Sequence, residues 1–137
     1  MTVRLVIDGA VAAEMLRGPN GMVMRDLIDR ATRVQLAARS QAKGKGGGSG
    51  KLASDITKRV AHEGVDPKIM VGAWNNPYAL FVHEGTAQHW IYPHNAKALY
   101  FFWPKANPAG WVFAKKVHHP GTSPNPYLAD QLHLAIE

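Results

Sequence analysis

The chain has 137 residues, no cysteine and a formal net charge of +6. This length predicts a single domain with one core, and the lack of cysteine excludes both a disulfide framework and a cysteine nucleophile. The first residues include Asp8 and Glu14 and hold no long apolar run, so they do not resemble a secretory signal. No segment is apolar for long enough to span a bilayer, and we therefore expect a soluble protein.

The positive charge is concentrated in residues 30–54, which contain no acid, whereas bases and acids balance in the rest of the chain. The bases of this segment are Arg30, Arg33, Arg39, Lys43, Lys45 and Lys51. A basic patch of this kind attracts phosphate backbones or acidic protein surfaces, and the alternative is a solvated helix face followed by a loop. The candidate contact patch consists of Arg39, Lys43, Lys45 and Lys51.

The N-terminal part of the chain predicts an extended segment followed by two helices. Residues 3–7, VRLVI, form a short strand or an extended arm, and Asp8 can then cap a helix that ends near Arg17. From about Met22 to Ala42, apolar residues recur at steps of three and four, which predicts a long helix with one buried stripe. The stripe consists of Met24, Leu27, Ile28, Ala31, Val34 and Ala38.

The middle of the chain predicts a flexible loop, a hairpin and a short helix. Residues 44–50, GKGGGSG, form the loop, and Leu52 to His62 and Lys68 to Trp74 form two strands around a turn at Glu63 to Pro67. Asn76 and Pro77 can begin a short helix that Gly85 ends. Within this helix we expect three side chains to face inward, those of Tyr78, Phe81 and Val82.

The remaining residues predict a second hairpin and a terminal helix. The strands run from Ala98 to Trp103 and from Trp111 to Val117, and PKANPAG joins them. A helix from about Pro126 to Ile136 follows, with Leu128, Leu132 and Ile136 on one face. The predicted fold class is α+β, a single domain over residues 1–137 with an antiparallel sheet of about four strands. A long N-terminal helix packs across the sheet, and a short middle helix and a C-terminal helix complete it.

The histidines invite a metal-site interpretation, because neutral imidazole is a common metal ligand. However, His83 and Glu84 are followed by Gly85 and Thr86, so the H-E-x-x-H spacing of a zinc protease is absent. A looser site that uses His83, His89 and His119 remains open on spacing alone. We predict no metal and no other cofactor.

Other catalytic patterns are also missing. No serine or threonine lies in a G-x-S-x-G nucleophile elbow. Residues 85–129 contain no acid, so they lack the paired carboxylates of a glycosidase. In the glycine run, Lys51 is followed by Leu52 rather than by the Ser or Thr of a P-loop. We predict no catalytic residue and no enzymatic activity.

Two segments stand out, HEGTAQHWIYP at residues 83–93 and HHPGTSPNPYL at residues 118–128. Together with GKLASDI at residues 50–56, the aromatic segment ALYFFW between them and the terminal helix, they resemble the neck or tail-completion proteins of long-tailed bacteriophages. The resemblance covers the chain from about Met22 onward. The loop GKGGGSG departs from the family pattern, in which this loop is short and often contains proline.

The resemblance implies a structural virion protein of the head-to-tail junction, assembled in the host cytoplasm. Its partners would be further copies of itself in a ring of six or twelve, the neighbouring connector and tail proteins, and DNA in the channel, but no membrane. It also implies that the two segments form tight turns, which we expect to lie side by side and to act as fold determinants or subunit contacts. The turn residues are His83, Gly85, Thr86, His89, His119, Pro120, Gly121 and Thr122. The alternative functions are a small basic nucleic-acid-binding domain and a histidine-based metallohydrolase.

Overall fold

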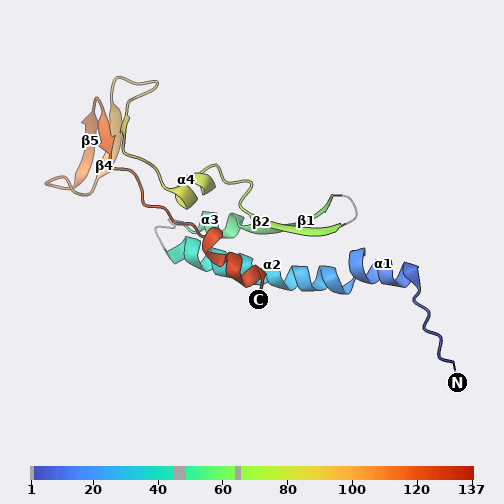
Figure 1. The fold of residues 1–137 in the computed structure, drawn as a ribbon. Helices are drawn as coiled ribbons and strands as arrows, with labels where there is room; N and C mark the ends of the chain where they lie inside the picture. The colour runs from blue at the N-terminus through green and yellow to red at the C-terminus, as the bar shows by residue number, and fades with distance from the viewer. Residues whose placement is uncertain (1, 45–48, 64–65) are drawn as a thin grey trace.

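In the computed structural model of the chain, residues 2–44, 49–63 and 66–137 are described. The molecule is elongated, with two consecutive helices along one side and the β3–β6 and β4–β5 strand pairs at the end farthest from the N-terminus (Figure 1). It is an α+β fold, as the sequence predicts. The predicted flexible loop falls largely outside the described residues, which resume at Ser49.

Helices α1 (Gly9–Arg17) and α2 (Met22–Gly44) begin where the sequence predicts. The Asp8 side chain accepts hydrogen bonds from the backbone N–H of Ala10 at 2.9 Å and of Val11 at 3.3 Å, which satisfies N–H groups that have no partner within the helix. No residue of α1 is buried. The predicted stripe of α2 is confirmed, since its members are buried or half-buried, and its buried residues are Met24, Ala31, Val34, Gln35, Ala38 and Ala42.

A short helix, α3 (Lys51–Asp55), replaces the first half of the strand predicted from Leu52. Gly50 precedes it with φ of 78°, a left-handed conformation that only glycine adopts without strain. The turn of helix buries Leu52 and Ala53 in one cluster with Ala38 and Ala42 of α2. The prediction was wrong here because Leu52 and Ala53 are consecutive buried residues, which an alternating strand does not provide.

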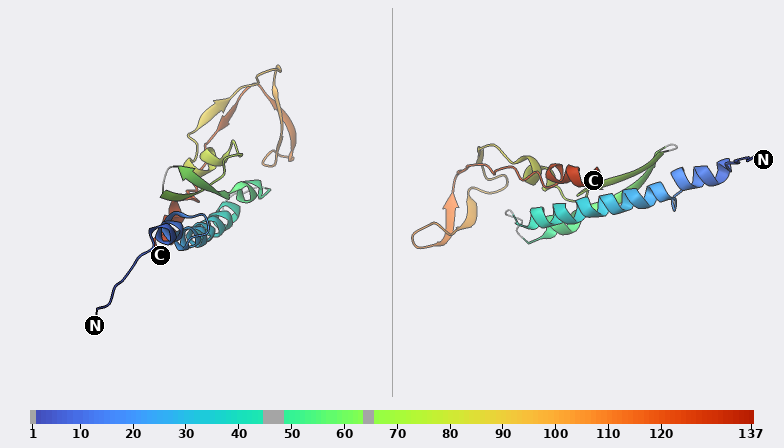
Figure 2. Two further views of the ribbon diagram at one scale, coloured as in Figure 1. Left: turned by 90° about the vertical axis from the view of Figure 1, so that its right-hand side faces the viewer. Right: turned by 60° about the horizontal axis from the view of Figure 1, so that its bottom comes forward.

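Strands β1 (Thr57–Glu63) and β2 (Asp66–Gly72) form an antiparallel hairpin that lies over α2 (Figures 1 and 2). Val60 pairs with Ile69, and Lys58 pairs with Val71. Lys58 donates to the Thr32 hydroxyl of α2 at 2.5 Å, so this face of the hairpin is the one that covers the helix. The strands extend into the turn predicted at Glu63 to Pro67, since Glu63 pairs with Asp66 and Pro67 lies in β2. Residues 64–65 lie outside the described residues.

The predicted short helix is α4 (Ala79–Glu84), and the terminal segment forms a 3-10 helix, η1 (Ala129–Ala135), against α2. Arg30 of α2 donates to the Ala135 carbonyl at 3.0 Å and fixes the end of η1. The prediction that Tyr78 and Phe81 face inward was wrong, because both are exposed. The side chain of Tyr127 occupies the core beside α4 instead.

The remaining strands form two further two-stranded sheets. Strand β3 (His89–Ile91) pairs with β6 (Val117–His119), and β4 (Leu99–Trp103) pairs with β5 (Gly110–Ala114). The described strands thus make three separate antiparallel pairs rather than one continuous sheet of about four. We call residues 86–122 the distal arm, because they leave the helical body and project beyond it (Figure 1).

The core is small. Its main cluster consists of Ala38, Ala42, Leu52, Ala53, Ile56 and Tyr127, where α2, α3 and the C-terminal segment meet. The chain exposes 10444 Å² of accessible surface. A compact monomer of this mass would expose about 7,000 Å². Among the described residues, no helix is both long and apolar enough to cross a membrane.

Candidate functional site

The two His-Gly-Thr segments meet at the base of the distal arm. The backbone N–H of Thr86 donates to the Thr122 carbonyl at 3.0 Å, and the N–H of Thr122 donates to the Thr86 carbonyl at 3.0 Å. Their hydroxyl oxygens are also 3.0 Å apart, so one hydroxyl donates to the other. This antiparallel bridge closes the distal arm where its two ends join the body.

Glycine is required on each side of this bridge. Gly85 has φ of 75° and Gly121 has φ of 84°. A Cβ atom at Gly85 would lie 2.5 Å from the Thr122 carbonyl oxygen, and one at Gly121 would collide with the Thr86 carbonyl oxygen. Each glycine therefore lets the backbone turn and also leaves room for the other segment. The exposed Pro120 precedes Gly121 and follows the last residue of β6.

The imidazoles of His89 and His119 stack across the β3–β6 pair, with ring centroids 5.1 Å apart. Nδ1 of His89 donates to the Ala87 carbonyl at 2.9 Å, whereas Nδ1 of His119 accepts from the Gly121 N–H at 3.1 Å. As neutral imidazoles, the two rings would therefore be opposite tautomers. Both rings support the turns beside them.

His83 lies apart from that pair, at the end of α4. Its Nδ1 is 2.7 Å from Glu84 Oε1, and its Nε2 accepts from the Ala129 N–H at 3.4 Å. The ring also meets Tyr127 edge-on, with centroids 5.2 Å apart. His83 therefore links α4 to the start of η1, and its role is to join two segments of the body.

The histidine side chains that the structure describes do not converge on a metal site. Among the described residues, no group of three or more His, Asp or Glu side chains is arranged to hold a metal ion. The threonine hydroxyls pair with each other, and the described hydrogen bonds do not connect them to an imidazole that could act as a base. The arrangement positions backbone segments and offers no nucleophile paired with a base.

Two residues that sequence reasoning missed anchor the arm to the body. The Asn125 N–H donates to the Val82 carbonyl at 3.0 Å, and its side-chain oxygen accepts from Gln41 of α2 at 3.0 Å. Tyr127 is 2% exposed, and its hydroxyl donates to the Ala79 carbonyl at 3.3 Å. Burial raises the pKa of Tyr127 above its ordinary value. The only signal for this anchor in the sequence was an asparagine between two prolines, since Asn125 stands in the segment PNPY.

The predicted basic patch divides into residues with different roles. Arg39 Nε donates to the Ile56 carbonyl at 2.9 Å, beside Gln35, which donates to the same oxygen at 3.0 Å. Lys43 is exposed on the last turn of α2, and Lys45 lies outside the described residues. The patch is therefore not a uniform charged surface.

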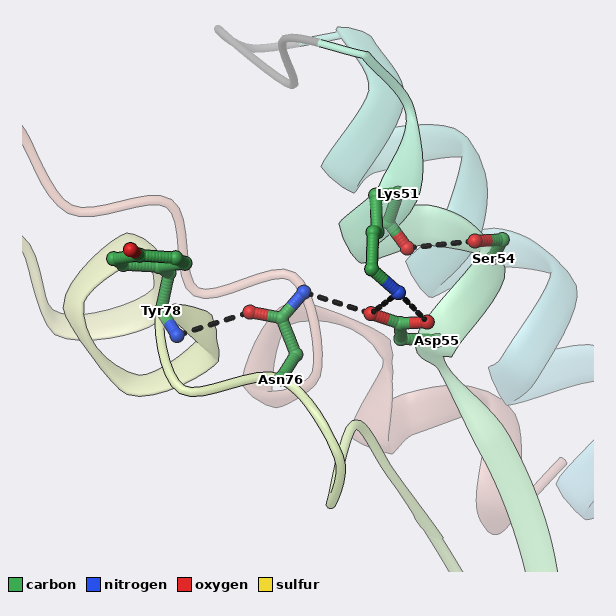
Figure 3. A network of polar contacts seen from close by, with 5 residues as sticks. All are labelled: Lys51, Ser54, Asp55, Asn76 and Tyr78. Atoms are coloured by element: carbon green, nitrogen blue, oxygen red, sulfur yellow. Dashed lines mark hydrogen bonds and ion pairs between the residues drawn. The ribbon is translucent and has the colours of Figure 1, made fainter.

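Lys51 belongs to a local polar network (Figure 3). Its Nζ contacts the two carboxylate oxygens of Asp55 at 3.0 and 3.1 Å, and Asp55 also accepts from the Asn76 side chain at 2.9 Å. The hydrogen bond from Lys51 and then that from Asn76 hold the pKa of Asp55 below its ordinary value. The Asn76 oxygen accepts in turn from the Tyr78 N–H at 2.9 Å, so the network joins α3 to the segment before α4.

Comparisons with protein-family models, with curated proteins and with solved structures found no match to this chain.

Proposed function

We propose that this chain is a structural subunit of a bacteriophage head-to-tail junction, that it assembles into a ring, and that it has no catalytic activity. The observation that carries the proposal is the mismatch between a small core and a large exposed apolar surface. The accessible surface of 10444 Å² exceeds that of a compact monomer by about 3,400 Å². Many large apolar side chains contribute to it, at the N-terminus, in α4 and throughout the distal arm.

The excess includes polar surface, but the large apolar side chains that contribute to it favour a surface that another molecule covers. A standard protein interface takes about 800 Å² from each partner, so the excess is large enough for at least two such contacts per chain. A subunit of a closed ring needs two, one with each neighbour. The family resemblance of the two His-Gly-Thr segments assigns the ring to the neck, between connector and tail, around the channel through which DNA passes.

The test is a joining assay with the complete chain. Heads and tails are prepared from a phage whose own copy of this gene carries a stop codon, and the purified protein is added back. We expect infectious particles to form only when the protein is present, and we expect the protein to appear in multiple copies at the junction of each particle. Joining without the protein would overturn the proposal.

Two measurements address the alternative functions. One zinc per chain by elemental analysis, lost in His83→Ala or His89→Ala, would favour a metallohydrolase. Tight binding of double-stranded oligonucleotides by the protein alone at physiological salt, together with an inactive joining assay, would favour a nucleic-acid-binding domain.

A further inference from the structure

Two apolar surfaces of this molecule have no cover within the described part of the chain, and they lie at opposite ends. The first, which we call the N-terminal arm, is residues 2–7. Its apolar side chains are between 72% and 86% exposed, and they are Val3, Leu5, Val6 and Ile7. It continues into α1, where Val11, Met15 and Leu16 are also exposed. Figures 1 and 2 show this segment pointing away from the body.

The second surface, which we call the aromatic ladder, lies on one face of the β4–β5 hairpin. Tyr100 pairs with Phe113 and Phe102 pairs with Trp111, and these side chains are between 51% and 74% exposed. Tyr100 stacks on Phe113 at 4.5 Å and on Trp111 at 4.9 Å, so the rings form one continuous apolar face. A solvated strand face normally carries polar side chains, and this one carries four large aromatic ones.

The hairpin that carries the ladder is incompletely packed against the rest of the distal arm. A hollow of about 330 Å³ lies between the hairpin and the β3–β6 pair, and its lining includes Ile91, Leu99, Phe101 and Val117 together with Tyr100 of the ladder. A two-stranded sheet on its own is marginally stable in water. A molecule that covered the ladder would therefore stabilise the hairpin.

We propose that the N-terminal arm of one copy packs on the aromatic ladder of the next copy, head to tail. This inference rests on the proposed self-assembling function and names the surfaces that meet. Backbone complementarity favours this pairing over a ladder-to-ladder contact. In the described structure the backbone of Thr2 to Ile7 takes part in no hydrogen bond, and β4 and β5 pair only with each other, which leaves strand edges open. An extended apolar segment can join an open edge of the hairpin by strand addition, and its alternate side chains then lie next to the rings of the ladder on the same face.

Geometry supports the same choice. Because the two surfaces occupy opposite ends of an elongated molecule, one copy cannot satisfy both within itself (Figure 1). Two different surfaces that pair between copies make a heterologous interface, which is the kind of interface that builds a ring when the rotation between neighbouring copies divides a full turn. A ladder-to-ladder contact would stop at a dimer and would leave the N-terminal arm uncovered.

The first experiment maps the contact directly in the purified full chain. Phe113 is replaced by the photoreactive residue p-benzoylphenylalanine, which keeps an aromatic ring in the ladder, and isotope-labelled and unlabelled copies are mixed before irradiation. We expect cross-links that join position 113 of one copy to residues 2–16 of another. Cross-links from ladder to ladder, cross-links to the helical body, or no intermolecular cross-link at millimolar protein would overturn the proposal.

The second experiment uses complementary variants in sedimentation. The arm variant carries Leu5→Asp and Ile7→Asp, and the ladder variant carries Trp111→Ser and Phe113→Ser. Each should associate at least tenfold more weakly than the wild type. Their mixture should form one-to-one dimers and nothing larger, because only the ladder of the arm variant and the arm of the ladder variant remain intact.

A matched control separates this effect from a general loss of apolar surface. Leu36→Ser and Met70→Ser remove two exposed apolar side chains from α2 and the β1–β2 hairpin and should leave association unchanged. Circular dichroism checks that every variant folds. A mixture of the arm and ladder variants that stays monomeric would overturn the proposed pairing even if joining of heads and tails succeeds. Dimers of the mixture with a failed joining assay would leave the pairing intact and overturn the neck assignment.

Discussion

Thr86 and Thr122, 36 residues apart in the chain, face each other in an isolated antiparallel bridge, with both backbone hydrogen bonds formed and the hydroxyls in contact. Thr86 and Thr122 are the first and last residues of the distal arm, so the bridge joins the two ends of the arm where they meet the body. The two segments that resemble enzyme motifs in the sequence thus form the base of a projecting structural element.

We predict that Gly121→Ala and Gly85→Ala each destabilise the protein by about 1–3 kcal/mol or more, because the residue must hold a left-handed conformation. The added Cβ atom also meets backbone of the opposite segment, which cannot move without opening the bridge. Urea denaturation measures the loss. Gly110→Ala is the matched control, because the nearest atom to its Cβ would be 3.9 Å away and its φ is not positive. Equal stabilities for these variants would contradict the proposed role of the turns.

We predict a large difference between two substitutions of Tyr127. Tyr127→Ala removes an aromatic side chain from the centre of the core and should cost about 3–5 kcal/mol. Tyr127→Phe keeps the ring and loses one hydrogen bond to the Ala79 carbonyl, which should cost about 1 kcal/mol. Thermal unfolding compares the two. Similar losses for both would mean that the hydroxyl, and not the ring, holds the C-terminal segment in place.

The sequence predicted local structure well where one residue or one period decides it. Asp8 caps α1, and the stripe from Met24 to Ala38 specifies the buried face of α2, because each depends on neighbours in the chain. It also predicted the β1–β2 and β4–β5 hairpins, whose strands are neighbours in the chain. It did not predict the β3–β6 pair or the division into three sheets, since alternation shows which residues share a face and not which distant strand lies beside them. The prediction that Tyr78 and Phe81 face inward failed for a different reason. An apolar side chain predicts a buried position, but many large apolar side chains of this chain are exposed in the structure.

The candidate site was predictable in part. The glycines and threonines of the two segments indicated turns, and the structure brings these turns together. The anchors Gln41 and Asn125 were not predicted, because their hydrogen bond joins residues that only the folded chain brings into contact. The division of the basic patch also required the structure, since sequence does not show that Arg39 points at the Ile56 carbonyl.

We predict that Asp55 contributes to the stability of the protein at neutral pH and that this contribution is lost in acid. The folded-state pKa of Asp55 lies below its ordinary value, so the contribution is fully present above that ordinary value, about 4, and is lost as the pH falls through the folded-state pKa. Denaturation midpoints between neutral pH and about pH 3 should therefore fall less steeply for Asp55→Asn than for the wild type. Lys51→Ala should reduce the slope in the same direction, because Lys51 is the main cause of the shift. Parallel slopes for all three proteins would contradict this assignment.

The last prediction separates two bases that lie four residues apart on α2. Arg39 donates to a buried carbonyl, so Arg39→Ala should destabilise the free protein by about 1.5–3 kcal/mol, the range for a hydrogen bond to a charged group. Lys43 is exposed at the end of the helix, and Lys43→Ala should change stability by less than about 0.5 kcal/mol. In the joining assay we expect the opposite order, so that loss of the exposed lysines impairs joining more than Arg39→Ala does when both proteins are folded. Lys43→Ser combined with Lys45→Ser should impair joining, because it removes charge that can face DNA or an acidic partner, while Lys51 stays paired with Asp55. Full joining by this double variant at physiological salt would reduce the exposed part of the basic patch to an ordinary solvated surface.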